Sequence, residues 1–307
     1  MSNDGGEMME EIRIECPKIF DYEQCLAYFK RDENEVLFEV VDQKIYRAVK
    51  IEDIKLLLCI SYDRNYLIVE ILNGISVTPE KVERLVAFIE EWFDFSADLS
   101  SFYQYGRKNE ILRPLINELY GLRLIRIPDF FEAISWGIIG QQINLTFAYQ
   151  LKKRLVEHFG DKITFENKDY YIHPTVDVIS KVSVKELMDL QFSRRKAEYL
   201  IDIAKRMHSK MLSKEMLLKM KDEKEVEKAL VNIRGIGPWT AHYVMMRSLG
   251  IKNAFPIGDV GLQNALKNIL NLEQKPTKEQ MVKLNEGWEL WSSYATFYIW
   301  RAPHIKK

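Results

Sequence analysis

The first hundred residues show the apolar and polar pattern of β-strands followed by a helix. Four apolar segments rich in β-branched and aromatic residues, separated by short polar turns, cover residues 36–41, 44–49, 54–60 and 66–72. The Asp42-Gln43 pair is the expected turn between the first two. Residues 78–92 then change to helical spacing after Thr78-Pro79, a pair typical of a helix start. The pattern predicts two antiparallel hairpins with a helix packed on their sheet.

After about residue 105 the apolar positions follow helical spacing almost throughout, which predicts successive helices with short connections. One long helix is expected to begin at Pro128-Asp129, to run to about Phe159 and to stop at Gly160. Only residues 161–172 are expected to form a short hairpin. The predicted fold class is α+β, with an antiparallel α+β N-terminal domain at residues 1–105 and an all-helical domain at residues 106–307.

Composition excludes several classes of protein and site. The 44 Lys and Arg residues nearly balance the 45 Asp and Glu residues, so any binding of a polyanion must be local. Three cysteines without a C-x-x-C motif exclude a disulfide framework and an iron–sulfur cluster, and the histidines lack metal-ligand spacing. We therefore expect no cofactor and no metal. The acidic start, which lacks signal-peptide features, leads us to expect a cytoplasmic protein with a disordered first dozen residues.

The segment 230–250, LVNIRGIGPWTAHYVMMRSLG, carries the most specific pattern in the chain. Gly235 and Gly237 allow positive φ and close backbone approach, and Ile236 between them is suited to the core. Pro238 suits the first turn of the following helix, where its missing N–H costs nothing. Outward backbone N–H groups at this hairpin, together with the positive end of the helix dipole, predict phosphate binding. A tight turn between helices that binds nothing explains the same glycines.

Asp259 follows in AFPIGDVGLQNALKNIL, after an apolar turn and at the start of another expected helix. Taken alone, Asp259 is a favourable N-cap. The motifs G-I-G-P-W-T-A-H-Y and F-P-I-G-D-V-G-L together resemble the helix-hairpin-helix DNA glycosylases, in which a catalytic aspartate follows the hairpin. The resemblance covers residues 130–301 and is strongest with the alkylated-base branch, the class II or AlkA-like DNA-3-methyladenine glycosylases.

The resemblance implies a base excision repair enzyme that hydrolyses the N-glycosidic bond of flipped-out alkylated purines in duplex DNA, such as 3-methyladenine and 7-methylguanine. Asp259 would stabilise the positive charge that develops on the sugar. Bifunctional members carry a nucleophilic lysine where this chain has Trp239, so a monofunctional enzyme is implied. Trp239, Tyr243 and Trp291 are the implied walls of the base pocket, because aromatic faces attract a cationic base.

DNA contacts are implied for the hairpin and for a glutamine pair upstream: Gly235, Ile236, Gly237, Thr240, Gln141 and Gln142. Gln142 lies where the family places the residue that fills the gap left by the flipped base. Buried hydrogen bonding between helices explains the glutamine pair equally well. Arg194, Arg195 and Lys196 either contact phosphate or begin a solvated helix.

Several alternatives stay open. The enzyme could act on deaminated bases such as hypoxanthine or uracil, or the chain could be a non-enzymatic DNA-binding protein. For Tyr294 and Tyr298, packing in the core of the last helix is preferred to a pocket role. The excess of basic over acidic residues in 191–247 fits a DNA-facing side, or simply solvated amphipathic helices. The expected partner is double-stranded DNA that contains a damaged base. We expect the protein to be a monomer and not to bind a membrane.

Overall fold

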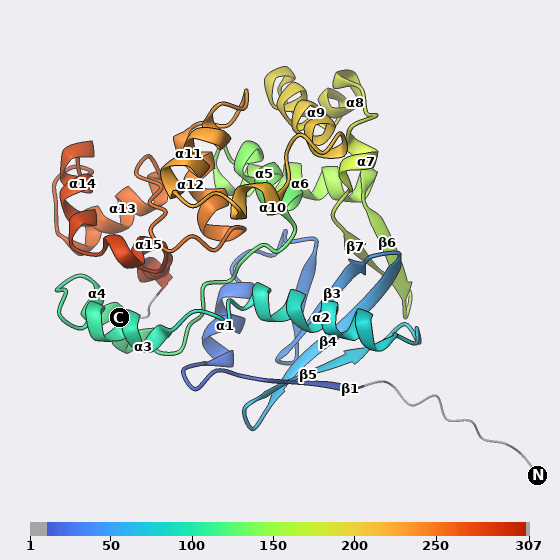
Figure 1. Ribbon diagram of the computed structural model, residues 1–307, viewed down its shortest axis with the longest axis horizontal. Coiled ribbons are helices and arrows are strands. Elements are labelled where there is room, and N and C mark those ends of the chain that lie inside the picture. Colours follow the sequence, from blue (N-terminus) through green and yellow to red (C-terminus); the bar gives the residue numbers. More distant parts are fainter. Residues whose placement is uncertain (1–10, 305–307) are drawn as a thin grey trace, which may run out of the picture.

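The computed structural model describes residues 11–304, and its N-terminal part is a five-stranded antiparallel sheet with helices (Figure 1). The strand order is β1-β5-β4-β3-β2. The elements are β1 (Glu11–Glu15), α1 (Tyr22–Phe29), β2 (Phe38–Val41), β3 (Lys44–Ile51), β4 (Ile54–Asp63), β5 (Tyr66–Ile71) and α2 (Pro79–Trp92). The four expected strands and the expected helix are confirmed, with small shifts at their ends.

β1 is a strand that the apolar pattern does not predict. Its EIRIE sequence pairs with β5 along the whole strand, from Glu11 opposite Glu70 to Glu15 opposite Tyr66. The expectation of disorder is therefore wrong for residues 11 and 12, and its remainder, residues 1–10, lies outside the part of the chain that the structure describes. The backbone hydrogen bonds to β5 stabilise this edge strand, although three of its five side chains are charged.

The central strand β4 is buried on both faces, which explains its nearly continuous apolar sequence. Leu56 and Leu58 face the main core, which also contains Leu85 of α2. Leu57, on the other face, packs with Ile172. The turn before β3 has positive φ at both Asp42 (47°) and Gln43 (63°), the geometry of a type I′ hairpin, and confirms the predicted turn.

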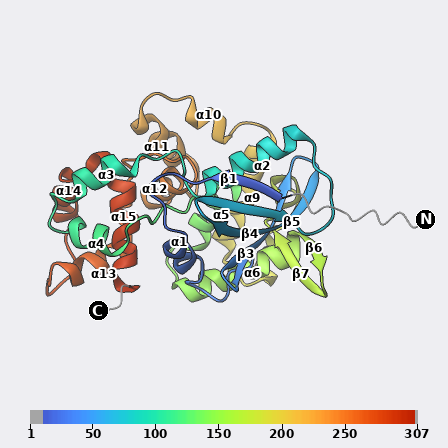
Figure 2. The same cartoon turned by 90° about the horizontal axis from the view of Figure 1, so that it is seen from below.

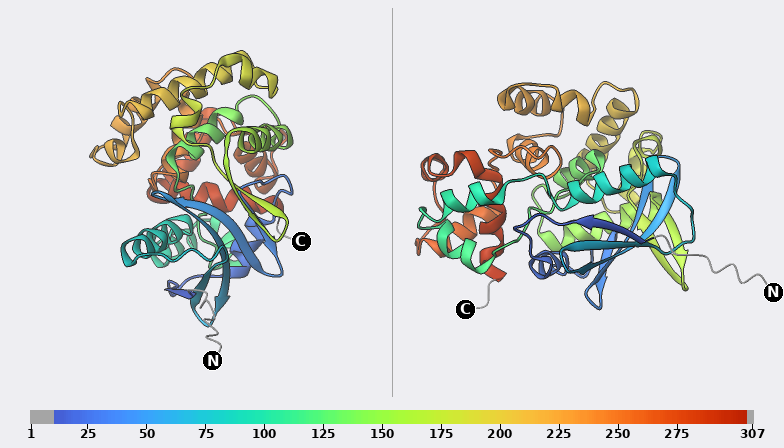
Figure 3. Two further views of the ribbon diagram at one scale, coloured as in Figure 1. Left: turned by 90° about the vertical axis from the view of Figure 1, so that its right-hand side faces the viewer. Right: turned by 60° about the horizontal axis from the view of Figure 1, so that its bottom comes forward.

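The C-terminal part is helical apart from one hairpin, as expected. Its elements are α3 (Leu99–Gly106), α4 (Leu112–Glu118), α5 (Phe130–Ile139), α6 (Leu145–Phe159), β6 (Asp161–Phe165), β7 (Lys168–Ile172), α7 (Val176–Ile179), α8 (Val184–Asp189), α9 (Arg194–His208), α10 (Lys214–Leu218), α11 (Glu223–Val231), α12 (Pro238–Arg247), α13 (Val260–Ile269), α14 (Lys278–Glu286), η1 (Glu289–Trp291), α15 (Ser292–Arg301) and η2 (Ala302–His304). In both views of Figure 3, α8 to α11 lie on the side remote from the sheet.

The prediction of one continuous helix from residue 128 to 159 is wrong, because the structure has two helices in this segment. α5 ends at Ile139, and the chain turns through Gln142, which has a φ of +56° that a helix does not allow. Asn144 then caps α6 by accepting a hydrogen bond from the Phe147 N–H. Nowhere in residues 11–304 is a helix both long and apolar enough for a bilayer crossing.

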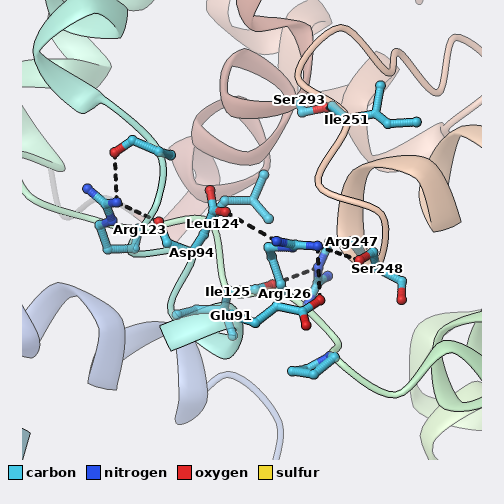
Figure 4. A network of polar contacts seen from close by, with 12 residues as sticks. Glu91, Asp94, Arg123, Leu124, Ile125, Arg126, Arg247, Ser248, Ile251 and Ser293 are labelled. Carbon is cyan, nitrogen blue, oxygen red and sulfur yellow. Dashed lines mark hydrogen bonds and ion pairs between the residues drawn. The ribbon is translucent and has the colours of Figure 1, made fainter. Parts of the chain in front are cut away.

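The two parts share one continuous core. α1 lies between the sheet and α15 (Figure 2), with the Tyr28 ring 4.8 Å from that of Phe297. The extended segment before α5 is held between the parts by Arg126 (Figure 4), whose guanidinium lies 3.0 Å from Glu91 Oε1 and also donates to the Ser248 carbonyl. The domain division at residue 105 stays a prediction.

Candidate active site

The hairpin between α11 and α12 has the geometry that its glycines predict. Gly235 has a φ of +95°, and a Cβ added there would lie 2.3 Å from the Tyr199 ring of α9, so only glycine fits. Ile236 fills the core as expected, being 3% exposed. Gly237 is the N-cap of α12 without a capping side chain, and Pro238 follows at the first position. The first turn of α12 therefore presents N–H groups that no side chain of the cap satisfies.

Gln141 fixes this hairpin to the end of α5. Its Nε2 donates to the Gly235 carbonyl at 2.9 Å and to the Thr240 hydroxyl at 3.0 Å. Thr240 itself is buried against α5, where a Cβ on Gly137 would lie 2.7 Å from its Cγ2. The side chains of Gln141 and Thr240 therefore support the hairpin from inside, whereas Gln142 is exposed at the turn between α5 and α6.

Asp259 is the N-cap of α13 and is also held by two tryptophans. Its Oδ1 accepts hydrogen bonds from the Leu262 N–H at 2.6 Å and from Trp300 Nε1 at 2.9 Å. Its Oδ2 accepts from Trp239 Nε1 at 2.9 Å. The carboxylate is partly exposed and fixed in one orientation. The capping role and the proposed catalytic role are thus combined in one side chain.

An aromatic wall lies beside this carboxylate. The rings of Trp239 and Tyr243 are stacked with centroids 5.8 Å apart, and Tyr243 lies 6.4 Å from Trp300. Trp136 of α5 packs with the same group. Burial raises the pKa of Tyr243, and the Arg247 guanidinium, which donates to its hydroxyl at 3.1 Å, opposes this rise. The phenol is therefore neutral at physiological pH.

The expectation for Trp291 needs correction. This residue lies at the start of α15, where it contacts the Phe102 ring at 5.6 Å and the Lys252 ammonium at 4.8 Å, away from the aromatic wall. Trp300, at the other end of the same helix, is the residue of α15 that lies beside Tyr243 and donates to Asp259. Tyr294 and Tyr298 are fully buried, which confirms the preferred core role.

The loop that leads to Asp259 is fixed to α12 through His242. Its Nδ1 accepts a hydrogen bond from the Phe255 N–H at 3.0 Å, and its Nε2 lies 3.3 Å from Glu227. Burial lowers the pKa of His242, although Glu227 opposes this effect. A neutral imidazole is what the Phe255 contact needs, because a protonated Nδ1 could not accept.

The start of α9 lies close to the turn that carries Gln142. Lys196 donates through Nζ to the Ile139 carbonyl at the end of α5, at 2.8 Å, and burial lowers its pKa. Arg194 and Arg195 are exposed at the same helix start. Lys196 therefore has a structural partner, whereas the two arginines are available to solvent. No group of three potential metal ligands occurs among residues 11–304.

Comparison with known proteins identifies the family. The model described as HhH-GPD superfamily base excision DNA repair protein matches residues 136–290, and that of the 8-oxoguanine DNA glycosylase N-terminal domain matches residues 8–134. The chain is 43% identical to the DNA-3-methyladenine glycosylase of Bacillus subtilis (strain 168) over 297 residues, which cover 96% of this chain and 98% of that protein.

Solved structures agree with this assignment. The 3-methyladenine DNA-glycosylase from Archaeoglobus fulgidus superposes with a TM-score of 0.83 at 26% identity, over 95% of this chain and 98% of that one. The Clostridium acetobutylicum 8-oxoguanine glycosylase/lyase, solved with double-stranded DNA, has the same fold, with a TM-score of 0.74 at 18% identity and 97% of both chains covered. The chain therefore belongs to the HhH-GPD superfamily of base excision DNA repair proteins and is a DNA glycosylase of the 3-methyladenine type.

Proposed function

We propose that this glycosylase is monofunctional and hydrolyses the N-glycosidic bond of alkylated purines, of the 3-methyladenine and 7-methylguanine type, that are flipped out of duplex DNA. One observation carries the proposal. The Asp259 carboxylate is fixed by two indole N–H groups beside an aromatic wall, and one of these indoles belongs to the helix that begins at the hairpin. Phosphate binding at the hairpin would therefore position the sugar relative to Asp259.

The chemistry follows from the charge of an alkylated nucleotide. When the C1′–N9 bond breaks, positive charge appears on the sugar, and a fixed carboxylate stabilises it without reorganising. The Asp259 carboxylate would also orient the incoming water or accept its proton. The base already carries positive charge, so the faces of Trp239 and Tyr243 attract it, each contact contributing about 0.5 to 2 kcal/mol. A strong general acid is not needed for such a leaving group.

Trp239 supports the monofunctional part of the proposal. It occupies the position of the lysine in bifunctional relatives, and an indole cannot form a Schiff base with the sugar. Water is then the nucleophile, and the product strand stays intact with an abasic site. Gln142 would fill the gap left by the base, and Arg194 and Arg195 would contact phosphates. We propose that the enzyme works as a monomer, which light scattering of the purified protein tests.

A panel of duplexes tests the substrate class and the reaction type together. Each duplex carries one damaged base, either an alkylated purine, hypoxanthine or uracil, and a labelled strand. Base release is scored by strand breakage after alkali, and lyase activity by breakage without alkali. We expect alkali-dependent breakage with the alkylated purines. Breakage without alkali contradicts the monofunctional proposal, and the absence of release from every alkylated duplex contradicts the substrate proposal.

A further inference from the structure

Behind the aromatic wall lies a small cavity between the sheet part and the helical part. Its volume is about 20 Å³, enough for one water-sized group but not for a purine ring. Tyr243, Trp136 and Tyr149 line it from the helical part, and Tyr28 and Arg31 from the N-terminal part. A base that stacks against the wall would reach this cavity only with an exocyclic group on its far edge.

The carboxylates around this cavity are already paired. Lys152 Nζ lies 2.7 Å and 2.9 Å from the two carboxylate oxygens of Glu35. Arg47 Nη2 lies 3.2 Å from Glu132 Oε2. Burial by itself raises the pKa of Glu35, but the charge and hydrogen bond of Lys152, the Leu37 N–H and the charge of Arg31 together hold this pKa below its usual value. Neither carboxylate is therefore a free acceptor for a base.

Three arginines that line the cavity each have one buried nitrogen without a hydrogen-bond partner among the described residues: Arg31 Nη1, Arg47 Nε and Arg126 Nε. Arg47 and Arg126 are ion-paired with Glu132 and Glu91, whereas Arg31 is held by tyrosines. Its Nε donates to the Tyr149 hydroxyl at 2.9 Å, and its guanidinium stacks 3.9 Å above the Tyr28 ring. These contacts fix the plane of the guanidinium. Its Nη1 is buried and, within the described part of the chain, has no hydrogen-bond partner. A buried donor of this kind is costly unless a ligand supplies an acceptor.

Neighbouring arginines add positive charge near the cavity, which further favours a ligand group that accepts hydrogen bonds. Arg247 also lines the cavity, with its Nε on the Ile125 carbonyl and its Nη1 on the Tyr243 hydroxyl. Arg301 lies on Tyr28 as well, 5.9 Å from the ring, and burial together with Arg31 lowers its pKa. Basic side chains outnumber the carboxylates around the cavity, which favours an oxygen that carries negative charge density over a donor group.

We infer, on the basis of the proposed function, that Arg31 determines specificity by donating a hydrogen bond from Nη1 to the C6 carbonyl oxygen of the flipped base. A guanidinium only donates, so it pairs with the oxygen of a 6-oxopurine and not with the amino group of a 6-aminopurine. With a 6-aminopurine, the N–H groups of the base and of Arg31 would face each other in a buried site without an acceptor between them. The favoured substrate class is therefore alkylated guanine, such as 7-methylguanine, over alkylated adenine.

The same contact favours departure of the base. Breaking the C1′–N9 bond leaves the electron pair on the base, so cationic 7-methylguanine leaves as the neutral free base. Water adds its oxygen to C1′ and releases one proton to the solvent. Electron density on the C6 oxygen rises as the bond breaks, and the hydrogen bond from Arg31 becomes stronger in the transition state than in the bound substrate.

Methylated duplex DNA tests the inference because it contains 7-methylguanine and 3-methyladenine in one substrate. The initial rates of release of both bases are measured by chromatography for the wild type, Arg31→Met and Arg31→Lys. Arg13→Met, at an exposed arginine of β1, is the matched control. We expect the rate ratio of 7-methylguanine to 3-methyladenine to fall about tenfold in Arg31→Met. A ratio within one reaction does not depend on the fraction of folded enzyme.

Arg31→Lys keeps the charge but loses the planar donor geometry, so its ratio is expected to fall by a smaller factor. It also decides the question if Arg31→Met does not fold. The Arg13→Met ratio is expected to equal that of the wild type. Release of both bases with the wild-type ratio in the Arg31 variants overturns the inference alone. Release of neither base by the wild type overturns the proposed function as well.

Discussion

A single carboxylate, that of Asp259, begins a helix and faces the proposed reaction. Because Oδ1 serves the Leu262 N–H and Trp300, and Oδ2 serves Trp239, the side chain is fixed before DNA arrives. Fixed charge is the form in which a carboxylate stabilises a developing cation most effectively, since no reorganisation is needed. The contacts that make Asp259 the N-cap of α13 therefore also hold its carboxylate in the orientation that the proposed reaction needs.

Asp259→Asn separates the two roles. The Asn oxygen still accepts from the Leu262 N–H, but the amide nitrogen cannot accept from the Trp239 indole N–H. We therefore expect the fold to be kept, with the melting temperature lower by only about a few degrees. The negative charge is lost, so base excision under single-turnover conditions should fall by at least about a hundredfold. A purified, folded variant with near wild-type excision would show that Asp259 is only a cap.

Trp300→Phe tests the second indole. The variant keeps the ring but loses the N–H that fixes Oδ1, so kcat should fall about tenfold while KM changes less. Trp291→Phe is the matched control, because Trp291 packs in the core away from the carboxylate. We expect it to keep kcat within about twofold of the wild type. Equal losses in both variants would assign the effect to packing of α15.

The sequence predicts that Asp259, Trp239 and Tyr243 belong to one site, because all three belong to motifs of fixed spacing, and the structure brings the three side chains together. Trp300 lies outside these motifs, in a C-terminal segment that contains several aromatic residues. Helical periodicity shows which of these residues share a face of the helix but not which face meets Asp259, so it does not distinguish Trp300 from Trp291. Arg31 belongs to no sequence motif, and only the fold brings it to the cavity that Tyr243 also lines.

At the scale of elements, the hairpin depends on contacts from α9 and from the turn that follows α5. Gly235 touches Tyr199 of α9, and Gln141 at the end of α5 donates to the Gly235 carbonyl. The sequence of the hairpin predicts the turn, but it does not predict the contacts with Tyr199 and Gln141. The apolar pattern also does not predict the break between α5 and α6. The uncharged sequence around Gln142 continues the apolar pattern, and only the Asn144 cap indicates a new start.

Gly235→Ala should displace the hairpin, since the added methyl group meets the Tyr199 ring and the φ of +95° is unfavourable for alanine. We expect DNA affinity, measured by fluorescence anisotropy with an uncleaved duplex, to fall about tenfold, with a smaller effect on stability. Gly287→Ala is the control, because its φ is negative and its nearest neighbour is at 3.4 Å. Unchanged affinity in Gly235→Ala would exclude the hairpin from DNA binding.

At the scale of the molecule, the sheet part and the helical part form one folded unit. The apolar pattern predicts both kinds of part, but it does not show that charged groups are buried where they meet. Glu35 and Lys152 come from different parts and are each about 93% or more buried as side chains. A buried pair of this kind is costly to break, because either partner alone is an uncompensated charge.

The pair predicts a pH dependence of stability. The pKa of Glu35 lies below its ordinary 4.5 in the folded protein, because Lys152, the Leu37 N–H and Arg31 together outweigh burial. Below that pH the unfolded chain binds more protons than the folded one. The stabilisation is therefore fully present above about pH 4.5 and is lost as the pH falls through the lower folded value, at up to about 1.4 kcal/mol per pH unit.

Urea unfolding at pH 6 and at pH 4 checks this dependence. Glu35→Gln should lower the free energy of unfolding by about 3 kcal/mol at pH 6, because Lys152 loses its partner. The difference between the two pH values should be smaller in this variant than in the wild type. Glu33→Gln, at an exposed neighbour, should keep the wild-type difference. The same difference in all three proteins would mean that Glu35 does not contribute.

The cavity behind the aromatic wall has a consequence for how such enzymes diversify. Asp259 belongs to the helical part, whereas Tyr28 lies near the end of α1 and Arg31 lies in the segment that follows α1. Mutations in that short segment can retune which lesions are accepted while the hydrolytic apparatus stays untouched. Transplanting it between relatives would be a direct route to glycosylases with altered damage preference.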